Sequence, residues 1–177
     1  MAAVRLVHTA ALERATLLAI RRLLDAVFEG EFDDHDWDHT IGGMHALAYH
    51  GDELIAHGSV VQRRLGHGGR ALRTGYVEGV GVRADRRREG HGGAVMAALE
   101  RVIRGAYELG ALGATDDGAA FYRTRGWRRW QGPTSALTPD GVVRTPDDDG
   151  AIFVLPVSAE LRVTGELKCD WRPGDVW

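Results

Sequence analysis

The stretch that decides the fold reads Val77-Glu78-Gly79-Val80-Gly81-Val82-Arg83-Ala84-Asp85-Arg86-Arg87-Arg88-Glu89-Gly90-His91-Gly92-Gly93-Ala94-Val95. Its first part is apolar, as in a strand, its middle is a basic turn with glycines, and its last part begins a run with helical periodicity. This order presents backbone N–H groups to phosphates, because glycines allow close approach and a helix N-terminus carries partial positive charge. The arginines at 86–88 add full charges, so we expect this turn to bind a phosphate-bearing ligand.

Two common phosphate-binding patterns are absent, the P-loop Gly-x-x-x-x-Gly-Lys-Ser/Thr and the dinucleotide pattern Gly-x-Gly-x-x-Gly. The spacing Arg87-x-x-Gly90-x-Gly92 after Val80-Gly81-Val82 instead resembles the acetyl-CoA motif of the GCN5-related N-acetyltransferases (GNAT). The resemblance implies acetyl-CoA as co-substrate, with the strand backbone on the pantetheine arm and the turn around the pyrophosphate. The implied cofactor-binding residues are Val80, Gly81, Val82, Arg87, Arg88, Glu89, Gly90, His91 and Gly92. The alternative is an ordinary basic connection between a strand and a helix.

The composition is that of an ordinary globular protein. At 177 residues, 44% apolar and 27% charged, the chain is expected to form one domain over residues 1–177. The single Cys169 excludes an intrachain disulfide and is expected to be a bystander. No run approaches the roughly 20 apolar residues of a membrane span, and the N-terminus lacks a secretory signal. We therefore expect a cytoplasmic protein.

The net charge of −3 is unevenly distributed. Residues 83–104 carry six arginines against three acidic side chains, whereas residues 139–177 carry eight acidic side chains against four basic ones. One region therefore suits an anionic ligand and the other a cationic ligand, such as a polyamine.

The hydrophobic pattern predicts an α/β (α+β) protein with a central mixed and mostly antiparallel sheet flanked by helices. The sheet is expected to turn parallel after the helix that follows the Gly-rich turn. This arrangement is similar to the GNAT fold that the resemblance implies. Strands are expected at residues 4–8, 44–49, 54–65, 71–82, 111–114, 127–130 and 152–155, and one more at 161–167. Helices are expected at 10–28 with Thr9 as N-cap, at 34–40, from the Gly-rich turn to about 109, and at 116–125. Residues 131–150 read as a long loop and 170–177 as an irregular tail.

Acetyl transfer to an amine needs a base for the amine and an acid for the leaving thiolate. Glu78 lies two residues before Val80 on one strand, so their side chains share a face, and Glu78 could accept the amine proton directly or through water. Tyr122 lies in the helix where these acetyltransferases often place a tyrosine near the CoA sulfur. The alternatives are an ion-paired strand glutamate and a packed aromatic side chain.

No metal site is expected. His35 and His39 have an i, i+4 spacing that can bind a metal, but no third ligand accompanies them.

Seven segments carry a closer resemblance, to the aminoglycoside 2′-N-acetyltransferases: residues 32–46, 75–80, 104–112, 125–127, 132–135, 144–150 and 169–177. This resemblance implies acetyl transfer to the 2′-amine of aminoglycoside antibiotics, resistance to them, and a homodimer. It implies Glu78 as the base, acting through a water molecule, and Tyr122 as the acid. The implied substrate-binding residues are Glu31, Asp36, Glu78, Gly79, Gly113, Asp147, Asp148, Asp175 and Trp177, the last through its carboxylate. Glu31 stands where an Asp is usual and Gly113 where a Ser is usual, which bears on the preferred drug.

Two other functions remain open. The chain could acetylate another small polyamine or a metabolite amine. It could also be a non-catalytic module whose arginines at 86–88 contact nucleic acid, although the acidic total and the lack of interleaved aromatic residues argue against this.

Overall fold

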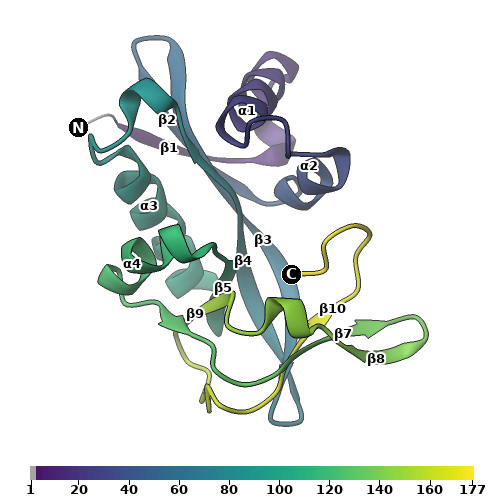
Figure 1. The fold of residues 1–177 in the computed structure, drawn as a ribbon. Helices are drawn as coiled ribbons and strands as arrows, with labels where there is room; N and C mark the ends of the chain where they lie inside the picture. Colours follow the sequence, from purple (N-terminus) through teal and green to yellow (C-terminus); the bar gives the residue numbers. More distant parts are fainter. Residues whose placement is uncertain (1–2) are drawn as a thin grey trace. The chain divides into compact units, whose positions relative to one another are not determined.

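The computed structural model describes residues 3–177, apart from the side chain of Asp117. The chain divides into two compact units. The first contains the residues up to Val61 together with Val77–Val102, and the second contains Gln62–Tyr76 together with Ile103–Trp177. The long strands β3 (Glu53–His67) and β4 (Arg70–Val82) contribute residues to both units (Figure 1). The expectation of a single domain stays a prediction.

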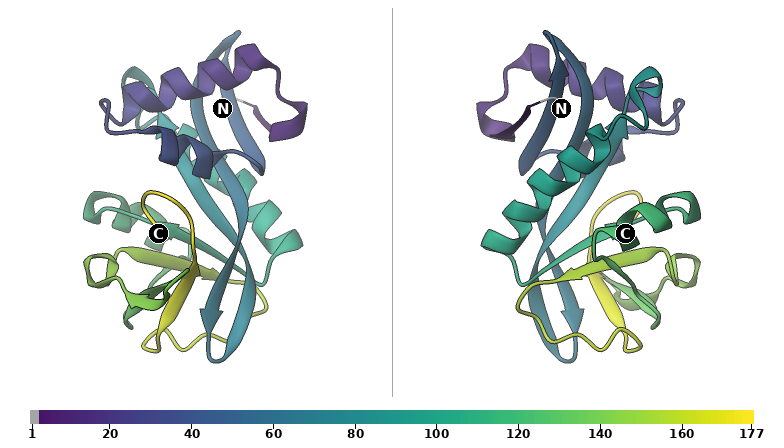
Figure 2. Two further views of the ribbon diagram at one scale, coloured as in Figure 1. Left: turned by 90° about the vertical axis from the view of Figure 1, so that its right-hand side faces the viewer. Right: turned by 90° about the vertical axis from the view of Figure 1, so that its left-hand side faces the viewer.

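The first unit is an antiparallel sheet with helices on both faces. It contains β1 (Val4–His8), α1 (Arg14–Val27), α2 (Asp34–Thr40), β2 (Met44–His50), the adjoining parts of β3 and β4, and most of α3 (His91–Ala106). β2 pairs antiparallel with both β1 and β3. A Cβ on Gly58 would lie 2.9 Å from Val95 of α3, and a Cβ on Gly81 would lie 3.3 Å from Val27 of α1. The two glycines therefore allow α3 and α1 to pack closely on opposite faces of these strands (Figure 2).

The predicted strand at 4–8 and the predicted helix at 34–40 are confirmed. The helix α2 begins with a capping box, in which Asp33 accepts from the backbone of Asp36 and Asp36 accepts from the backbone of Asp33. The predicted cap of α1 is wrong. Residues Thr9–Ala11 form a short 3₁₀ helix, and α1 begins at Arg14 with Glu13 as its N-cap residue. The hydroxyl of Thr9 instead contacts His45, so a tertiary contact replaces the local cap.

The second unit contains the remaining strands and α4. Its elements are β5 (Leu109–Gly113), α4 (Asp116–Thr124), β6 (Arg128–Arg129), β7 (Thr134–Thr138), β8 (Gly141–Arg144), the 3₁₀ helix η3 (Pro146–Asp148), β9 (Ile152–Pro156) and β10 (Leu167–Asp170). The strand order is β6-β9-β5-β4-β3-β10-β7-β8. The predicted change to parallel pairing after α3 is confirmed, since β5 pairs parallel with β4. β10 also pairs parallel with β7, which was not predicted.

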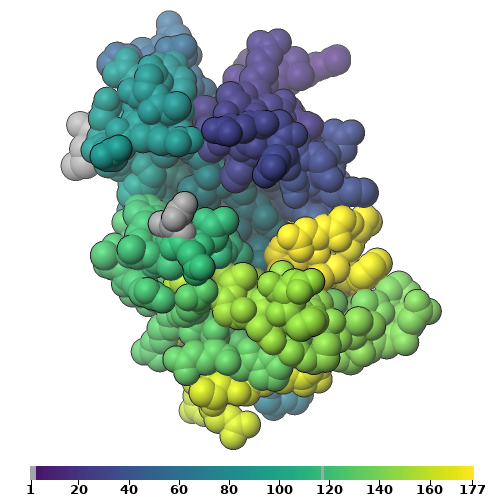
Figure 3. Space-filling model, viewed as in Figure 1, coloured from purple at the N-terminus to yellow at the C-terminus, as the bar shows by residue number. Residues whose placement is uncertain are grey.

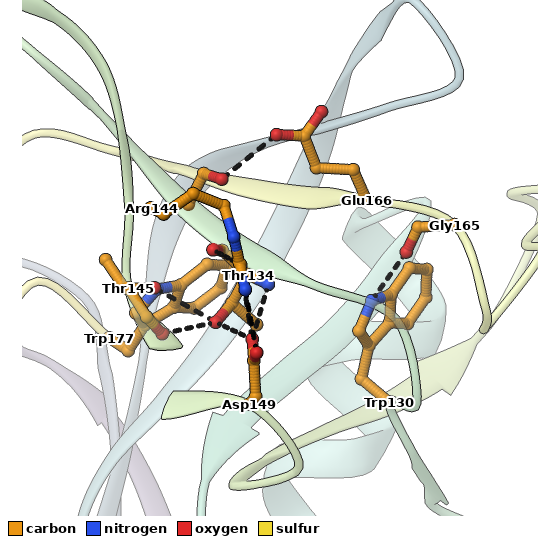
Figure 4. Close-up of polar contacts among 9 residues, drawn as sticks. Trp130, Thr134, Arg144, Thr145, Asp149, Gly165, Glu166 and Trp177 are labelled. Atoms are coloured by element: carbon orange, nitrogen blue, oxygen red, sulfur yellow. Dashed lines mark hydrogen bonds and ion pairs between the residues drawn. The ribbon is translucent and has the colours of Figure 1, made fainter. Parts of the chain in front are cut away.

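Two predictions for this unit are wrong. Residues 131–150 are not a long loop, because β7 and β8 form an antiparallel hairpin there. Its turn, Thr138-Pro139-Asp140-Gly141, is a common turn sequence that could have revealed it. The last strand begins at Leu167, so residues 161–166 are not part of it. They lie instead beside the fully buried Trp130, whose ring N–H donates to the Gly165 carbonyl at 3.0 Å (Figure 4).

Across the described residues, no helix is both long and apolar enough to cross a membrane.

Candidate active site

The strand β4 continues to Val82, but its backbone is irregular at Gly79. This residue has a φ of +54°, in the left-handed region that favours glycine. A Cβ there would lie 3.1 Å from the Thr40 hydroxyl and 3.2 Å from Leu24, so the surrounding helices leave little space for a side chain. Regular alternation therefore does not hold across Gly79, and the argument that Glu78 and Val80 share a face does not apply. Glu78 itself is half-buried.

The Gly79 carbonyl is held by a buried histidine. It accepts from His57 Nδ1 at 2.7 Å, and His57 Nε2 lies 2.9 Å from His45 Nδ1. His45 Nε2 in turn lies 2.8 Å from the Thr9 hydroxyl. Burial lowers the pKa of His45 to about 4 and the pKa of His57 to about 3, so both rings are neutral at neutral pH. This group was not predicted, because single histidines in two apolar strands carry no sign of their pairing.

The basic turn after β4 leads directly into a helix N-terminus. Arg88 has a φ of +64° and Gly90 a φ of +88°. The first backbone hydrogen bond of α3 is donated by the Ala94 amide to the Gly90 carbonyl. The amides of the first helical turn precede that bond and are available to an anion. Open space surrounds the position of a Cβ on Gly90. This geometry fits the diphosphate of acetyl-CoA.

The arginines around this turn differ in their partners. Arg83 forms ion pairs with Glu53 at 2.7 Å and Asp85 at 2.6 Å, so its charge is largely compensated. Arg87 donates to the Val82 carbonyl at 3.4 Å. Within residues 3–177, leaving aside the side chain of Asp117, no ion pair involves Arg87 or Arg88. These two guanidinium groups are therefore the available cations of the turn.

In the second unit, Tyr122 of α4 lies among aromatic rings. Its ring centroid is 5.2 Å from Phe121, 6.2 Å from Trp127 and 6.1 Å from Phe153. Burial raises the pKa of Tyr122, so the phenol keeps its proton at neutral pH and can donate it. Gly113, at the exposed end of β5, has space for a side chain, since a Cβ would meet only the Tyr76 hydroxyl at 3.8 Å.

Carboxylates gather around η3 in the same unit. Asp148 is half-buried, and burial together with the negative charge of Asp175 raises its pKa. Asp147 beside it is exposed. Asp149 has a structural role instead, because it accepts from the amide and hydroxyl of Thr134 and pairs with Arg144 at 2.8 Å, which lowers its pKa (Figure 4). Asp148 and Asp175 are therefore carboxylates that a bound cation would stabilise.

The C-terminal tail is held in place by several bonds. Trp177 is buried, and its ring N–H donates to the Thr145 hydroxyl at 2.8 Å. Arg172 donates to the backbone oxygens of Asp175 and Trp177, at 2.9 and 2.7 Å. The buried Arg63 donates to the Val176 carbonyl at 2.7 Å. The tail therefore lies against the segment that carries η3 (Figure 3).

Within each unit, some of the predicted residues come together. In the first, Gly79 packs on Thr40, whose hydroxyl donates to the Asp36 carbonyl at 2.8 Å, so Gly79 lies beside the helix of Asp36. The carboxylate of Asp36 also caps α2, while Glu31 is exposed before that helix. In the second, Asp148 and Asp175 lie close together and Asp175 accepts from the Trp177 amide at 3.1 Å.

The described part of the chain contains no group of three or more His, Cys, Asp or Glu residues placed to hold a metal ion. Cys169 is buried, and burial raises the pKa of its thiol to about 11. A thiol with this pKa is protonated at neutral pH and is a poor nucleophile.

A basic turn that leads from a strand into a helix N-terminus is a typical binding site for a phosphate-bearing co-substrate. Residues 8–130 match the family model described as an acetyltransferase (GNAT) domain, and the chain belongs to this family. Members of the family use acetyl-CoA as co-substrate.

An aminoglycoside 2′-N-acetyltransferase of Mycolicibacterium fortuitum is 55% identical to this chain over 177 residues, which cover 98% of this chain and 91% of the relative. Among solved structures, Escherichia coli ElaA is similar with a TM-score of 0.63 and 20% identity, over 88% of this chain and 99% of ElaA. Eis1 from Mycobacterium abscessus has a TM-score of 0.62 and 20% identity, over 75% of this chain and 33% of Eis1. These two structural likenesses show the fold alone.

The neutral histidines predict a pH-dependent stability. The unfolded chain binds protons on both rings below about pH 6.5, whereas the folded chain does not until the pH approaches about 4 for His45 and about 3 for His57. Their contribution to stability is therefore complete above about pH 6.5 and is lost as the pH falls toward those values. As the pH falls from about 7 to about 4.5, the loss of each ring's contribution should lower the free energy of unfolding by about 2 kcal/mol.

Denaturant unfolding across this pH range checks the prediction. His45→Asn and His57→Asn should each reduce the slope of stability against pH, and the exposed His50→Asn should leave it unchanged. Equal slopes in all four proteins would contradict the assignment of two buried neutral imidazoles.

Proposed function

We propose that this acetyltransferase transfers the acetyl group of acetyl-CoA to the 2′-amine of aminoglycoside antibiotics and thereby confers resistance to them. The observation that carries the substrate class is the half-buried Asp148, whose pKa is raised by burial and by Asp175. Two carboxylates whose negative charges interact suit a ligand that carries ammonium groups. The 55% identity to the Mycolicibacterium fortuitum enzyme supports the specific amine.

In this proposal the co-substrate is held by the first unit. The amides at the start of α3, with Arg87 and Arg88, bind the diphosphate, and the backbone of Val80–Val82 contacts the pantetheine arm. Acetyl-CoA supplies an acetyl group activated as a thioester. In this proposal the backbone N–H of Val80 is the donor that polarises the thioester carbonyl.

Two side chains move protons. Glu78 accepts a proton from the substrate ammonium, directly or through a water molecule, so that the free amine forms the C–N bond. As the C–S bond breaks, the Tyr122 phenol donates its proton to the departing sulfur, and the second proton of the amine nitrogen, lost as the amide forms, restores the phenol. The phenol carries its proton at neutral pH, as this role requires, and burial raises the pKa of Tyr122 above its ordinary value.

The remaining predicted residues would hold the drug. Carboxylates at Asp147, Asp148 and Asp175 bind ammonium groups, and the buried ring of Trp177 fixes the tail that carries Asp175. Asp36, Gly79 and Glu31 contribute from the first unit, and Gly113 sets the space at the end of β5. We further propose a homodimer that acts in the cytoplasm, where acetyl-CoA is present.

A thiol-release assay tests the reaction with acetyl-CoA and a matched pair of aminoglycosides that differ only in a 2′-amine against a 2′-hydroxyl. We expect turnover with the amine and none above background with the alcohol. Mass spectrometry should show one added acetyl group. Equal rates on both drugs would exclude the 2′-position, and turnover confined to other polyamines would favour the alternative substrate class.

Removal of the proposed base and acid should affect the chemical step. Glu78→Gln should lower kcat by about 100-fold or more at neutral and lower pH, where the substrate amine is protonated. Tyr122→Phe should lower kcat by a similar factor while the affinity for CoA, measured by calorimetry, stays unchanged. Tyr107→Phe is the matched control, since burial also raises the pKa of Tyr107. A loss under about threefold in the two test variants would assign both residues to structure.

Removal of the acidic residues should affect the drug rather than the co-substrate. Asp148→Asn and Asp175→Asn should each raise KM for the aminoglycoside by about tenfold, because a hydrogen bond to a charged group contributes about 1.5–3 kcal/mol. KM for acetyl-CoA should be unchanged. Asp140→Asn, in the exposed β7–β8 turn, is the control. An unchanged KM for the drug in both test variants would show that η3 and the tail are not part of the substrate site.

A further inference from the structure

The series Thr9, His45, His57 and Gly79 admits only one arrangement of protons when both rings are neutral. A carbonyl oxygen only accepts, so His57 carries its proton on Nδ1 and donates it to Gly79. His57 Nε2 then accepts a hydrogen bond from the Nδ1–H group of His45. His45 Nε2 therefore also accepts a hydrogen bond, which the Thr9 hydroxyl donates.

The contacts around Thr9 agree with this direction. The Gly42 amide donates to the Thr9 hydroxyl oxygen at 2.9 Å, so that oxygen already has an incoming hydrogen bond. The Gly43 carbonyl, 3.1 Å from the same hydroxyl, already accepts from the Thr9 amide at 2.9 Å. A carbonyl oxygen can accept two hydrogen bonds, so the hydroxyl proton has two acceptors within reach, and His45 Nε2 is the closer one at 2.8 Å. Every polar hydrogen in the series has an acceptor, as a buried network requires.

The series ends on the peptide group that joins Gly79 to Val80. A trans peptide group is planar, so the direction of its carbonyl determines the opposite direction of its N–H. The hydrogen bond from His57 to the Gly79 carbonyl therefore also orients the Val80 amide. Ser59, two residues along β3 from His57, donates to the Glu78 carbonyl at 3.4 Å. Two side chains of β3 thus bind the consecutive carbonyls of Glu78 and Gly79 in β4.

We infer that Thr9, His45 and His57 form a positioning series that orients the Gly79–Val80 peptide for acetyl transfer. His57 is the positioning residue, His45 fixes the tautomer of His57, and Thr9 fixes the tautomer of His45. None of the three side chains touches the reacting atoms. The inference rests on the proposed role of Val80 in binding the acetyl donor.

Packing alone does not explain this use of polar side chains. The helices already hold Gly79 from one side, through Leu24 and Thr40. An apolar residue at position 57 would fill the space beside Gly79, but it would leave the carbonyl of Gly79 without this donor. The hydrogen bond at the end of the series therefore fixes the orientation of one peptide group, which apolar packing cannot do.

Two variants at position 57 separate orientation from packing. His57→Leu removes the donor, and it should lower kcat by about tenfold or more, because small misplacements at a reacting centre reduce the rate strongly. KM for acetyl-CoA and for a 2′-amino aminoglycoside should change by less than about threefold. His57→Asn keeps a side-chain N–H near the position of Nδ1, so it should restore most of kcat. The exposed His50→Leu is the control.

Nuclear magnetic resonance of the unsubstituted, ¹⁵N-labelled protein tests the series without a variant. At pH about 7, both rings should be neutral and carry their proton on Nδ1. A proton on Nε2 of either ring would overturn the inference, as would a folded His57→Leu protein with unchanged kcat. If His57→Leu does not fold, the tautomers measured on the unsubstituted protein still decide whether the series has the inferred hydrogen bonds. Absence of acetyl transfer to any aminoglycoside by the unsubstituted protein would instead contradict the proposed function, and the tautomers would still test the series.

Discussion

The hydrogen bond from His57 to the Gly79 carbonyl is the interaction on which the irregular part of β4 in the first unit depends. β4 cannot continue regularly past Gly79, because this residue has a φ of +54° and lies against Leu24 and Thr40. Its carbonyl consequently needs a partner from a side chain, and His57 provides it at 2.7 Å. The irregular backbone at Gly79 therefore does not leave this carbonyl unpaired.

The features that the sequence predicted well are those with local signals. The Gly-rich turn, the start of α3, the strand β1 and the helix α2 depend on residues within a few positions of one another. The histidine series could not be predicted, because His45 and His57 meet only through the pairing of β2 with β3. Thr9 illustrates the same limit. Its sequence position is that of a helix cap, yet its hydroxyl is used by His45 on another strand.

The acidic segment shows why residue type alone could not assign roles. Asp147, Asp148 and Asp149 are adjacent and chemically identical, yet the structure separates them by environment. Asp149 is compensated by Arg144 and Thr134, whereas Asp148 is half-buried near Asp175. The distinction arises because residues 131–150 form a hairpin that brings Thr134 and Arg144 to Asp149. A segment read as a loop could not reveal that partner.

The buried polar groups of the two units differ in charge and in whether their hydrogen bonds are complete. The histidine series is neutral and each hydrogen has an acceptor, so nothing is gained by adding a ligand there, and its effect is to keep one peptide group rigid. Asp148 is partly buried beside another carboxylate, so the unliganded protein carries an electrostatic cost at that point. A cationic ligand removes this cost on binding, which adds to its affinity, whereas a neutral ligand does not. Specificity for an amine-rich substrate can thus arise from repulsion within the free protein as well as from contacts in the complex.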